Sequence, residues 1–499
     1  MDSGIQEFFK NKTIFLTGGS GYLGKVVTEK LLRTTEVKRI YSLIRPKRGV
    51  SIEERILSLE KEPIFKVLLK AKPEALHRIY PIAGDCSDPD LGISDSDRKL
   101  LVSEVQVVIH GAATVRFDEP LHFALAINVR ATRLMLQLAK QMTQLVSYVH
   151  ISTAYSNCVV TEIDERFYPE NLSYSSDKIL AISNILGNER MDSLTSYLIG
   201  SFPNTYAYTK ALSEDFIRRE AGDLPLCIFR PAIIMPTYKD PVIGWMDNLF
   251  GPMAIVFGAA RGVVRAVMVE SKAKIGMVPA DYCGNVTLAC AWKTGQNPVK
   301  QGDAENSPIY TLAPSEKNTI SFGTYISKTL IHRDLTPITK MIWYPFLLCI
   351  SPPFFPLAAF FYHTLPGYFF DALLFLMGRK PILTKLYPKI HKNFAFLRPF
   401  ACTSFNFGTA NTQSLLEAMS KYDRSFYNFD MADLDWNDYL RCAIHGLRKY
   451  IAKDTNSAES IAKALKLKNR LKVLHYVSVM FLGSAVAYGM WILAKLFIG

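Results

Sequence analysis

The sequence contains few cysteines and spaces them widely. Its eight cysteines include no C-x-x-C pair, the spacing typical of zinc ligands and of redox-active dithiols. It also has no zinc-finger spacing and no arginine-rich block, so the usual signatures of nucleic-acid binding are missing. We therefore expect reduced thiols facing the cytosol, no bound metal and no nucleic-acid partner.

The sequence also lacks the features of a signal peptide and the high charge content of a disordered protein. Residues 1–5 include neither a basic stretch nor an apolar one, so we expect no signal peptide. Charged residues make up 21% of the 499 residues against 49% apolar ones, a balance that excludes a disordered chain. The 58 Lys and Arg outnumber the 45 Asp and Glu, and this excess favours an anionic partner: a phosphorylated cofactor, an acidic thioester or a membrane surface.

Short apolar runs alternate with amphipathic stretches over the first three hundred residues. This alternation is typical of βαβ units around a buried parallel sheet. We therefore predict an α/β fold with a doubly wound parallel sheet of extended Rossmann type over residues 1–305, ending at the polar segment 301–308. The clearest apolar runs are residues 13–16, 40–44, 107–110, 148–151 and 226–229.

The C-terminal part contains a long uncharged run. Residues 476–494 contain neither a charge nor a proline, and 19 residues suffice to cross a bilayer. Eight cations between residues 448 and 472 precede this run and only Lys495 follows it, which places the preceding domain in the cytosol. We predict a transmembrane anchor at 476–494, with a buried helix or a helix lying flat on the membrane as alternatives.

An apolar region rich in proline lies before the anchor. Residues 341–377 are dense in aromatic and aliphatic side chains, but five prolines interrupt them. Proline breaks the interior of a helix, and a span needs about 20 continuous apolar residues. We therefore expect interfacial or core packing here, within a connecting region of residues 306–380, and keep a span or a re-entrant hairpin as the alternative.

A glycine-rich loop follows the first predicted strand and opens the first helix. Gly18 permits a tight turn, Gly21 lets the backbone approach a pyrophosphate, and Gly24 allows close packing of helix on strand. The helix N-terminus then offers N–H groups and a partial positive charge to the phosphates. The predicted contacts of a dinucleotide here are Thr17, Gly18, Gly21, Tyr22, Leu23 and Gly24.

Cations after the second predicted strand indicate which dinucleotide binds. Arg45 and Lys47 stand where an NAD-selective site favours an acidic residue, so we predict NADPH with its 2′-phosphate held by these two side chains. Asp85 and Cys86 follow the next strand and are candidates to cover the adenine. The alternative for the basic segment is an ordinary solvated loop.

Tyr206 and Lys210 are the candidate catalytic pair. They are four residues apart and share one face of a predicted helix, whereas the i+4 partner of Tyr208 is Leu212. A nearby ammonium should lower the pKa of a phenol from ~10. Tyr206 could then donate a proton to a carbonyl oxygen that receives a hydride, while Lys210 also holds the nicotinamide ribose.

A hydroxyl group is also needed to orient the substrate carbonyl. Ser152 and Thr153 end an apolar strand, at the edge where open α/β sheets bind their ligands. Thr153 is the first candidate and Ser152 the alternate. A hydroxyl that only bonds its own backbone is the structural alternative.

With these motifs in place, the chain resembles the extended short-chain dehydrogenase/reductase family and, more narrowly, the fatty acyl-CoA reductases of animals and plants. The C-terminal matches imply a helical, reductase-associated domain over residues 381–455, and the segment 110–113 implies that Ala112 lies beside the nicotinamide. One departure is the segment 404–407, where the family usually has a Trp before the second Phe. The further matching segments are 128–129, 229–232, 244–251, 423–424, 429–430, 435–436, Tyr439 and 446–450.

The resemblance implies a reaction and a setting. A long-chain fatty acyl-CoA and two NADPH would give a primary fatty alcohol and free CoA through an aldehyde-level intermediate, with Tyr206, Lys210 and Thr153 as catalytic residues. The enzyme would sit in the endoplasmic reticulum or peroxisome membrane with its catalytic domain facing the cytosol, in contact with membrane lipid and as a monomer or homo-oligomer. The alternatives are a membrane-bound dehydrogenase of steroids or sugar nucleotides, and a catalytically silent NADP-binding scaffold.

Overall fold

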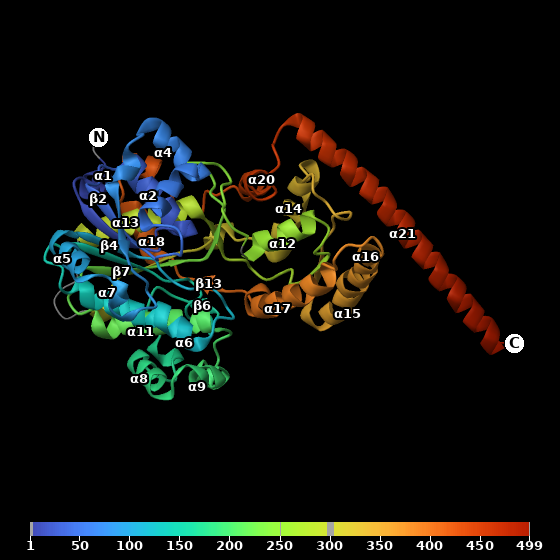
Figure 1. Ribbon diagram of the computed structural model, residues 1–499, viewed down its shortest axis with the longest axis horizontal. Helices are drawn as coiled ribbons and strands as arrows, with labels where there is room; N and C mark the ends of the chain where they lie inside the picture. Colours follow the sequence, from blue (N-terminus) through green and yellow to red (C-terminus); the bar gives the residue numbers. More distant parts are fainter. Residues whose placement is uncertain (1–2, 250, 297–303, 499) are drawn as a thin grey trace. The chain divides into compact units, whose positions relative to one another are not determined.

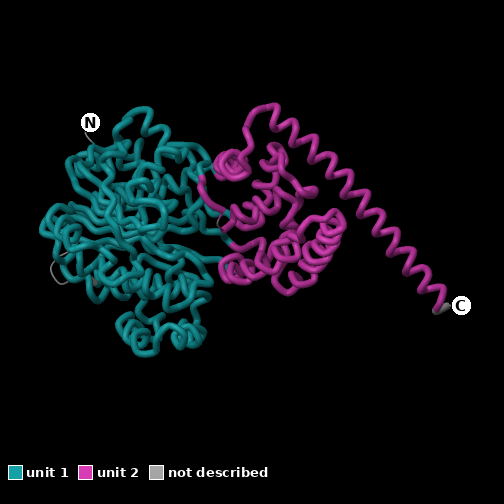
Figure 2. Tube along the Cα trace, in the orientation of Figure 1, with its two compact units in different colours: residues 1–245, 274–320, 403–435 teal, residues 246–273, 321–402, 436–499 magenta. Residues whose placement is uncertain are grey.

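The computed structural model describes residues 3–249, 251–296 and 304–498 (Figure 1). The chain divides into two compact units, shown in Figure 2: residues 1–245, 274–320 and 403–435 form the first unit, and residues 246–273, 321–402 and 436–499 the second. Phe250 of the matching segment 244–251 and residues 301–303 of the predicted boundary lie outside the described residues.

The two units interleave along the chain, unlike the predicted linear domains. Residues 246–273 belong to the second unit although they precede residue 305, and residues 403–435 return to the first unit from within the predicted domain 381–455. Strand pairing is one cause, because β13 (Asn406–Phe407) pairs in parallel with β6 (Glu162–Ile163). Phe405 and Phe407 also pack edge-on against Tyr155, two residues from Thr153.

The first unit is built on a seven-stranded parallel sheet, which confirms the predicted doubly wound fold (Figure 1). The strand order is β11-β7-β5-β4-β1-β2-β3. β2 and β3 follow on one side of β1 and the later strands on the other, so the topological switch point lies between β1 and β4. Ligands of such sheets bind beyond the carboxyl ends of the strands at this switch point. The strands are β1 (Thr13–Thr17), β2 (Arg39–Ile44), β3 (Ile79–Ala83), β4 (Val107–His110), β5 (Ser147–Ile151), β7 (Leu226–Pro231) and β11 (Ile309–Leu312).

Helices cover both faces of this sheet. On one face α2 (Tyr22–Thr34) packs against α13 (Ala280–Gln296), and on the other α7 (Ala131–Ala139) packs against α11 (Thr205–Glu220). Every residue of β1, β4, β5 and β7 is buried, as expected for a parallel sheet covered on both sides. The remaining elements of the unit are α1 (Gly4–Phe9), α3 (Ile52–Leu57), α4 (Lys66–Ala71), α5 (Asp95–Glu104), α6 (Leu121–Ala124), α8 (Ser176–Leu186), α9 (Asn188–Ser193), α10 (Thr195–Leu198), α18 (Ala410–Ala418), α19 (Lys421–Phe426), β8 (Ile233–Met235) and β10 (Met277–Pro279).

The second unit is mainly helical. Its one sheet among the described residues is the parallel pair β9 (Ala266–Met268) and β12 (Leu348–Ile350). Its helices are α12 (Gly251–Ala260), α14 (Phe322–Leu335), α15 (Phe355–Ala359), α16 (Leu365–Leu376), α17 (Leu383–Ala401), α20 (Trp436–Gly446) and α21 (Ala458–Ile498).

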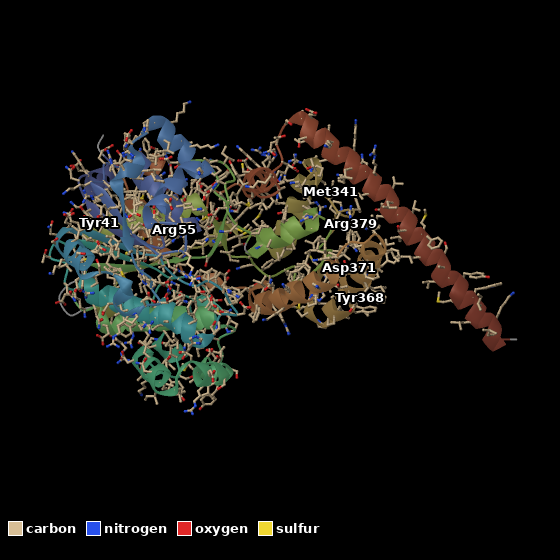
Figure 3. All side chains as sticks on the ribbon, viewed as in Figure 1. Tyr41, Arg55, Met341, Tyr368, Asp371 and Arg379 are labelled. Atoms are coloured by element: carbon tan, nitrogen blue, oxygen red, sulfur yellow. The ribbon has the colours of Figure 1, made fainter. Side chains whose placement is uncertain are left out.

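Residues 355–376 form one helical stretch in three parts: α15, a π-helical turn over Phe360–Thr364, and α16. Pro356 and Pro366 each stand within the first two positions of their α-helix, where the missing N–H costs little. The stretch packs along α17, and the Asp371 carboxylate accepts bonds from the N–H groups at the start of α17 (Figure 3).

The helix α21 contains the predicted anchor at 476–494. It is the one helix of the described part of the chain that is long and apolar enough to cross a membrane, and its apolar window is not buried by the rest of the protein. Before that window, Leu467 and Leu471 pack against Ala260, Ile338 and Met341. A long apolar helix that the protein leaves uncovered indicates membrane association.

Candidate active site

The glycine-rich loop passes so close to its surroundings that side chains are excluded. Gly18 has a φ of +76°, and a Cβ there would stand 2.8 Å from the backbone N of Ala112. A Cβ on Gly24 would stand 2.1 Å from the carbonyl oxygen of Gly18. The loop therefore keeps the tight cradle that a pyrophosphate needs, and the backbone of Ala112 lies beside it.

The start of α2 completes the cradle. Gly21 is its N-cap in an extended conformation, and the first N–H groups of any helix lack partners within that helix. The Tyr22 hydroxyl donates to the carbonyl oxygens of Met235 and Trp245, and its ring stacks on Trp245 at 5.1 Å. The Tyr22 side chain thus fixes a neighbouring segment, while Tyr22 and Leu23 are the first two residues of the helix that follows the glycine loop.

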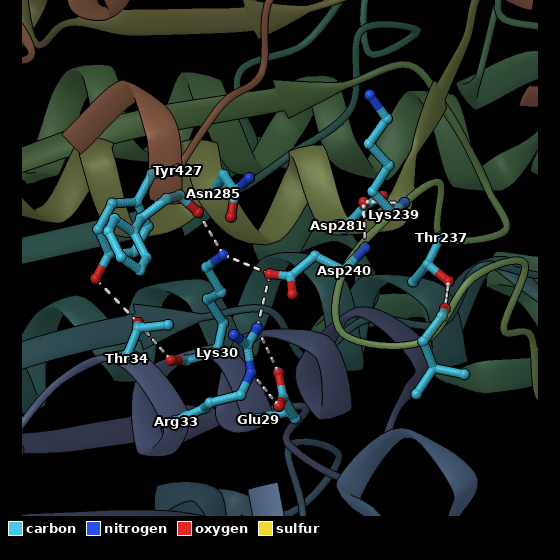
Figure 4. A network of polar contacts seen from close by, with 12 residues as sticks. Glu29, Lys30, Arg33, Thr34, Thr237, Lys239, Asp240, Asp281, Asn285 and Tyr427 are labelled. Carbon is cyan, nitrogen blue, oxygen red and sulfur yellow. Dashed lines mark hydrogen bonds and ion pairs between the residues drawn. The ribbon is translucent and has the colours of Figure 1, made fainter. Parts of the chain in front are cut away.

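A buried polar network anchors the far end of α2 (Figure 4). Lys30 donates to Asp240 at 2.6 Å and to the carbonyl oxygen of Phe426 at 2.6 Å, and Arg33 pairs with Glu29 and Asp240. Burial raises the pKa of Glu29 to about 7, although the Arg33 guanidinium opposes this shift. Residues distant in sequence thereby hold the helix whose N-terminus forms the cradle.

Two polar side chains tie the loop after β4 to its neighbours. The Thr17 hydroxyl lies 2.7 Å from Nδ1 of His110 and accepts a bond from the backbone N of Ala112 at 3.2 Å. Asn128 bonds both the backbone N and the carbonyl oxygen of Thr114, and its amide donates to Thr209 on α11. Thr17 therefore positions the loop after β4 by hydrogen bonds that link the ends of β1 and β4.

A further cation, Arg55, lies next to the predicted 2′-phosphate segment. Arg45 pairs with Asp85 at 3.1 Å, so two predicted cofactor contacts bind each other. Arg55 of α3, labelled in Figure 3, donates to the carbonyl oxygen of Arg45. Its guanidinium lies 3.5 Å from the Ser20 hydroxyl of the glycine loop. The sequence signal for Arg55 was its place on the helix that Ser51 caps directly after the basic segment.

Lys47 and Cys86, the other two predicted cofactor contacts after β2 and β3, differ in exposure. Lys47 is exposed in a tight turn in which the N–H of Val50 bonds its carbonyl oxygen. Cys86 is buried, and burial raises the pKa of its thiol to about 12. A neutral buried thiol can contact an adenine only by packing, whereas Lys47 is open to a phosphate.

The structure brings Tyr206 and Thr153 together. Asn204 caps α11 by accepting a bond from the N–H of Ala207 at 2.8 Å, which sets Tyr206 in the first turn. Burial raises the pKa of Tyr206 to about 12, and the hydrogen bond from Thr153 partly offsets this effect. The expected lowering of the Tyr206 pKa by lysine is therefore wrong for this structure, because desolvation of the phenolate outweighs the neighbouring groups.

Lys210 is buried one turn further along α11. Its ammonium donates to the carbonyl oxygen of Ile151, the last residue of β5, at 2.8 Å. Burial lowers the pKa of Lys210 to about 8, and the charge of Glu214 opposes that shift. The lysine is thus charged at neutral pH and stands at the carboxyl end of the sheet.

A buried ion pair that sequence reasoning missed lies next to this site. Arg230 and Glu214 are both buried, and Nη2 of Arg230 lies 2.6 Å from the Glu214 carboxylate. Ser152 donates its hydroxyl to the same carboxylate, which leaves Thr153 as the hydroxyl beside Tyr206. The one available signal was that Glu214 follows Lys210 by four residues.

Two protein-family models match this chain, one in its N-terminal part and one in its C-terminal part. A model of an NAD-binding domain, described as "Male sterility protein", matches residues 16–287, and a second model with the same description matches residues 362–454. The first match and the glycine cradle agree on a nicotinamide dinucleotide as cofactor.

Known proteins resemble the whole chain. It is 39% identical over 498 residues to fatty acyl-CoA reductase wat of Drosophila melanogaster, covering all of this chain and 95% of the relative. It is 33% identical to fatty acyl-CoA reductase 2 of Bos taurus, covering 95% and 90% of the two chains.

Solved structures share the fold at low sequence identity. The terminal R domain of the myxalamid PKS-NRPS pathway gives a TM-score of 0.57 at 18% identity, over 88% of this chain and 90% of that one. The R domain of a Mycobacterium tuberculosis nonribosomal peptide synthetase gives 0.56 at 17%, over 90% and 96%. From the full-length relatives and the matching family models, the chain belongs to the fatty acyl-CoA reductases, a family of oxidoreductases.

Proposed function

We propose that this protein reduces a long-chain fatty acyl-CoA to a primary alcohol and free CoA, with two NADPH and an aldehyde-level intermediate. The observation that carries the proposal is the contact of Tyr206 with Thr153 after β5, at the same carboxyl edge of the sheet where the glycine loop follows β1 and admits no side chain. The family to which the chain belongs supplies the substrate class.

Three cations support NADPH over NADH. Arg45 and Arg55 lie at the end of β2 beside the glycine loop, and Lys47 is exposed next to them. The 2′-phosphate carries the charge that distinguishes NADPH, and guanidinium groups bind phosphate with two donors at once. We expect a bound 2′-phosphate to compete with Asp85 for Arg45.

Each reduction would take one hydride from a bound NADPH, so a second NADPH would have to replace the spent NADP+ before the aldehyde is reduced. As negative charge develops on the thioester carbonyl oxygen, the Tyr206 and Thr153 hydroxyls would stabilise it. The resulting hemithioacetal loses the CoA thiolate and leaves an aldehyde. In the second reduction Tyr206 would donate its proton to the alkoxide oxygen, giving the alcohol.

The shifted pKa values of Tyr206 and Lys210 suit a reductase. A Tyr206 pKa of about 12 keeps the phenol protonated at neutral pH, so the acid holds the proton that it must give. A Lys210 pKa of about 8 keeps the ammonium charged in the same range. That charge would favour the phenolate which remains after proton transfer and would bind the nicotinamide ribose.

The apolar helix gives the proposed reaction its setting. Acyl chains and fatty alcohols partition into lipid, so an anchor at 476–494 would hold the enzyme at the store of its substrate and product. The cations before the anchor favour a cytosolic catalytic domain, on either the endoplasmic reticulum or the peroxisome.

The experiment that tests the proposal is Tyr206→Phe with Tyr208→Phe as the matched control. Tyr208 is buried among apolar residues of the core and lies two positions along the same helix. We expect Tyr206→Phe to bind NADPH normally and to lose turnover, while Tyr208→Phe keeps it. Turnover of Tyr206→Phe at the wild-type rate would remove Tyr206 as the acid.

A further inference from the structure

The helical stretch of residues 355–376 turns its apolar side chains away from the protein. Its buried residues follow a spacing of four: Phe355, Ala359, His363, Gly367 and Asp371. In a regular α-helix this spacing would drift by about 40° per step. The π-helical turn over Phe360–Thr364 has more residues per turn and offsets the drift, so the buried stripe stays on one side.

The opposite side of this stretch is apolar and exposed. We call it the outer face; its members are 50–80% exposed, a level unusual for large apolar side chains on one contiguous surface. Figure 3 labels Tyr368 on this helix. The outer face consists of Leu357, Phe361, Leu365, Tyr368, Phe369 and Leu376.

Polar contacts on the buried side prevent the helix from rotating. The Asp371 carboxylate accepts three N–H bonds and the Thr384 hydroxyl at the start of α17. His363 accepts the N–H groups of Arg265 and Ala266 and lies 3.0 Å from His391. Turning the outer face inward would break these buried bonds, so its exposure is a property of the folded unit.

The chain segment that contains the outer face carries almost only positive charges. Between Asp334 and Glu417 the sequence has seven Lys and Arg and a single acidic residue, Asp371, whose carboxylate is buried and hydrogen-bonded. Three of the cations, Lys385, Lys389 and Lys392, are exposed along α17, the helix packed beside the stretch. An apolar face bordered by cations matches the acyl region and the anionic headgroups of a membrane surface.

Contacts within the unit connect the outer face with the start of the anchor. His475, one residue before the predicted span, bonds the indole N–H of Trp343 and packs its ring against Tyr344 and Phe346. The Phe346 ring in turn contacts Tyr362 in the π-helical turn. If the anchor enters the bilayer at residue 476, these contacts hold the helical stretch at the membrane surface.

We propose that the outer face of residues 355–376 lies in the plane of the membrane, with its apolar side chains among the acyl chains and the α17 lysines at anionic headgroups. The orientation is in-plane because Lys385, Lys389 and Lys392 extend over about two turns of the neighbouring helix, and a perpendicular hairpin would place them in hydrocarbon. The chain thus contacts lipid twice, through α21 and through this face. The proposal rests on membrane anchoring by α21 and is independent of the proposed chemistry.

Photocrosslinking of the full chain in vesicles tests this proposal. A benzophenone amino acid is placed singly at Phe369 or at Leu376. The matched control carries it at Ile185 on α8 of the first unit, because Ile185 is 79% exposed and Leu376 is 80% exposed. A fourth probe at Val486 reports on the anchor itself. The vesicles contain phosphatidylcholine with or without phosphatidylserine, and mass spectrometry identifies what each probe has joined.

We expect lipid adducts at positions 369 and 376, several-fold above those at position 185 and increased by phosphatidylserine. Adducts to a second copy of the chain, or yields equal to the control at position 185, would overturn the in-plane face. Lipid adducts at Val486 without any at positions 369 and 376 would leave the anchor intact and refute only the face. Absence of adducts at Val486 would overturn the anchor and the proposal with it.

Discussion

Replacing Glu214 by Gln removes the negative charge beneath the candidate active site while preserving its shape. The carboxylate accepts bonds from Nε of Arg230 at 2.9 Å and from Nη2 at 2.6 Å, and also from the Ser152 hydroxyl. Removing one partner of a buried ion pair costs about 3–5 kcal/mol. Gln keeps one acceptor oxygen, and Arg230 keeps its bonds to the carbonyl oxygens of Asp164 and Arg166, so we expect the free energy of unfolding to fall by about 3 kcal/mol.

The same change should move the pH profile. Burial lowers the pKa of Lys210 to about 8, and the Glu214 charge opposes that effect, so the pKa of Lys210 falls further in Glu214→Gln. In the proposed mechanism the charged ammonium favours the phenolate left by proton transfer, so kcat/KM should decline above pH 8 in the wild type and at lower pH in the variant.

The stability of the fold should respond to pH in the opposite sense. The folded chain releases the Lys210 proton near pH 8, whereas the unfolded chain holds it to the ordinary value of 10.5. The unfolded state therefore binds more protons between these values, and the contribution of this lysine to stability rises with pH there.

The assays are chemical denaturation of the solubilised chain and kcat/KM across neutral and alkaline pH. Asp215→Asn is the matched control, because Asp215 is buried next in sequence but bonds Ser176 and Arg218 instead. We expect it to lose stability and keep the wild-type alkaline limb. An unshifted limb in Glu214→Gln, or an equal shift in both variants, would refute the assignment of that limb to Lys210.

Three further predictions follow from the loop, the cations and the anchor. In Gly24→Ala the added Cβ meets the Gly18 carbonyl at 2.1 Å, so calorimetry should show loss of NADPH binding in a folded chain; unchanged affinity would refute the cradle. Neutralising Arg45 and Lys47 with Gln should weaken NADPH binding by about a hundredfold or more and NADH binding little, since each of the two lost phosphate contacts costs ~1.5–3 kcal/mol. Equal losses for both cofactors would remove the 2′-phosphate assignment. Deleting the chain from residue 470 should release it from carbonate-washed membranes, and full retention would show that the anchor is not needed.

The fold was accessible from the sequence because its signals are local. Uninterrupted apolar runs indicate buried strands, and a glycine-rich loop marks a strand–helix junction. Both patterns can be recognised from residues that are neighbours in the sequence. Thr153 could be preferred over Ser152, but the reason became visible only with Glu214, which engages the Ser152 hydroxyl. The segment 403–435 shows the limit, because its place in the first unit depends on pairing with β6, far away in sequence.

The electrostatics of the site could not be predicted from residue spacing. Placing Lys210 four residues after Tyr206 suggested a lowered phenol pKa, yet burial raises it to about 12. Desolvation depends on everything packed around a group, and no local pattern reports it. Likewise, the prolines of residues 341–377 argued against a continuous helix, whereas a π-helical turn lets the helical stretch continue past Pro366.

The most direct measurement of the central claim is product analysis with labelled cofactor. The full chain in vesicles is incubated with a mixed pool of acyl-CoA species and NADPH that carries deuterium at both C4 positions, and the lipids are identified by mass. We predict that the wild type and Tyr208→Phe form primary alcohols with two deuterium atoms on C1. Tyr206→Phe should form none. Unlabelled alcohol, no lipid product from the wild type, or labelled alcohol from Tyr206→Phe at the wild-type rate would contradict this prediction.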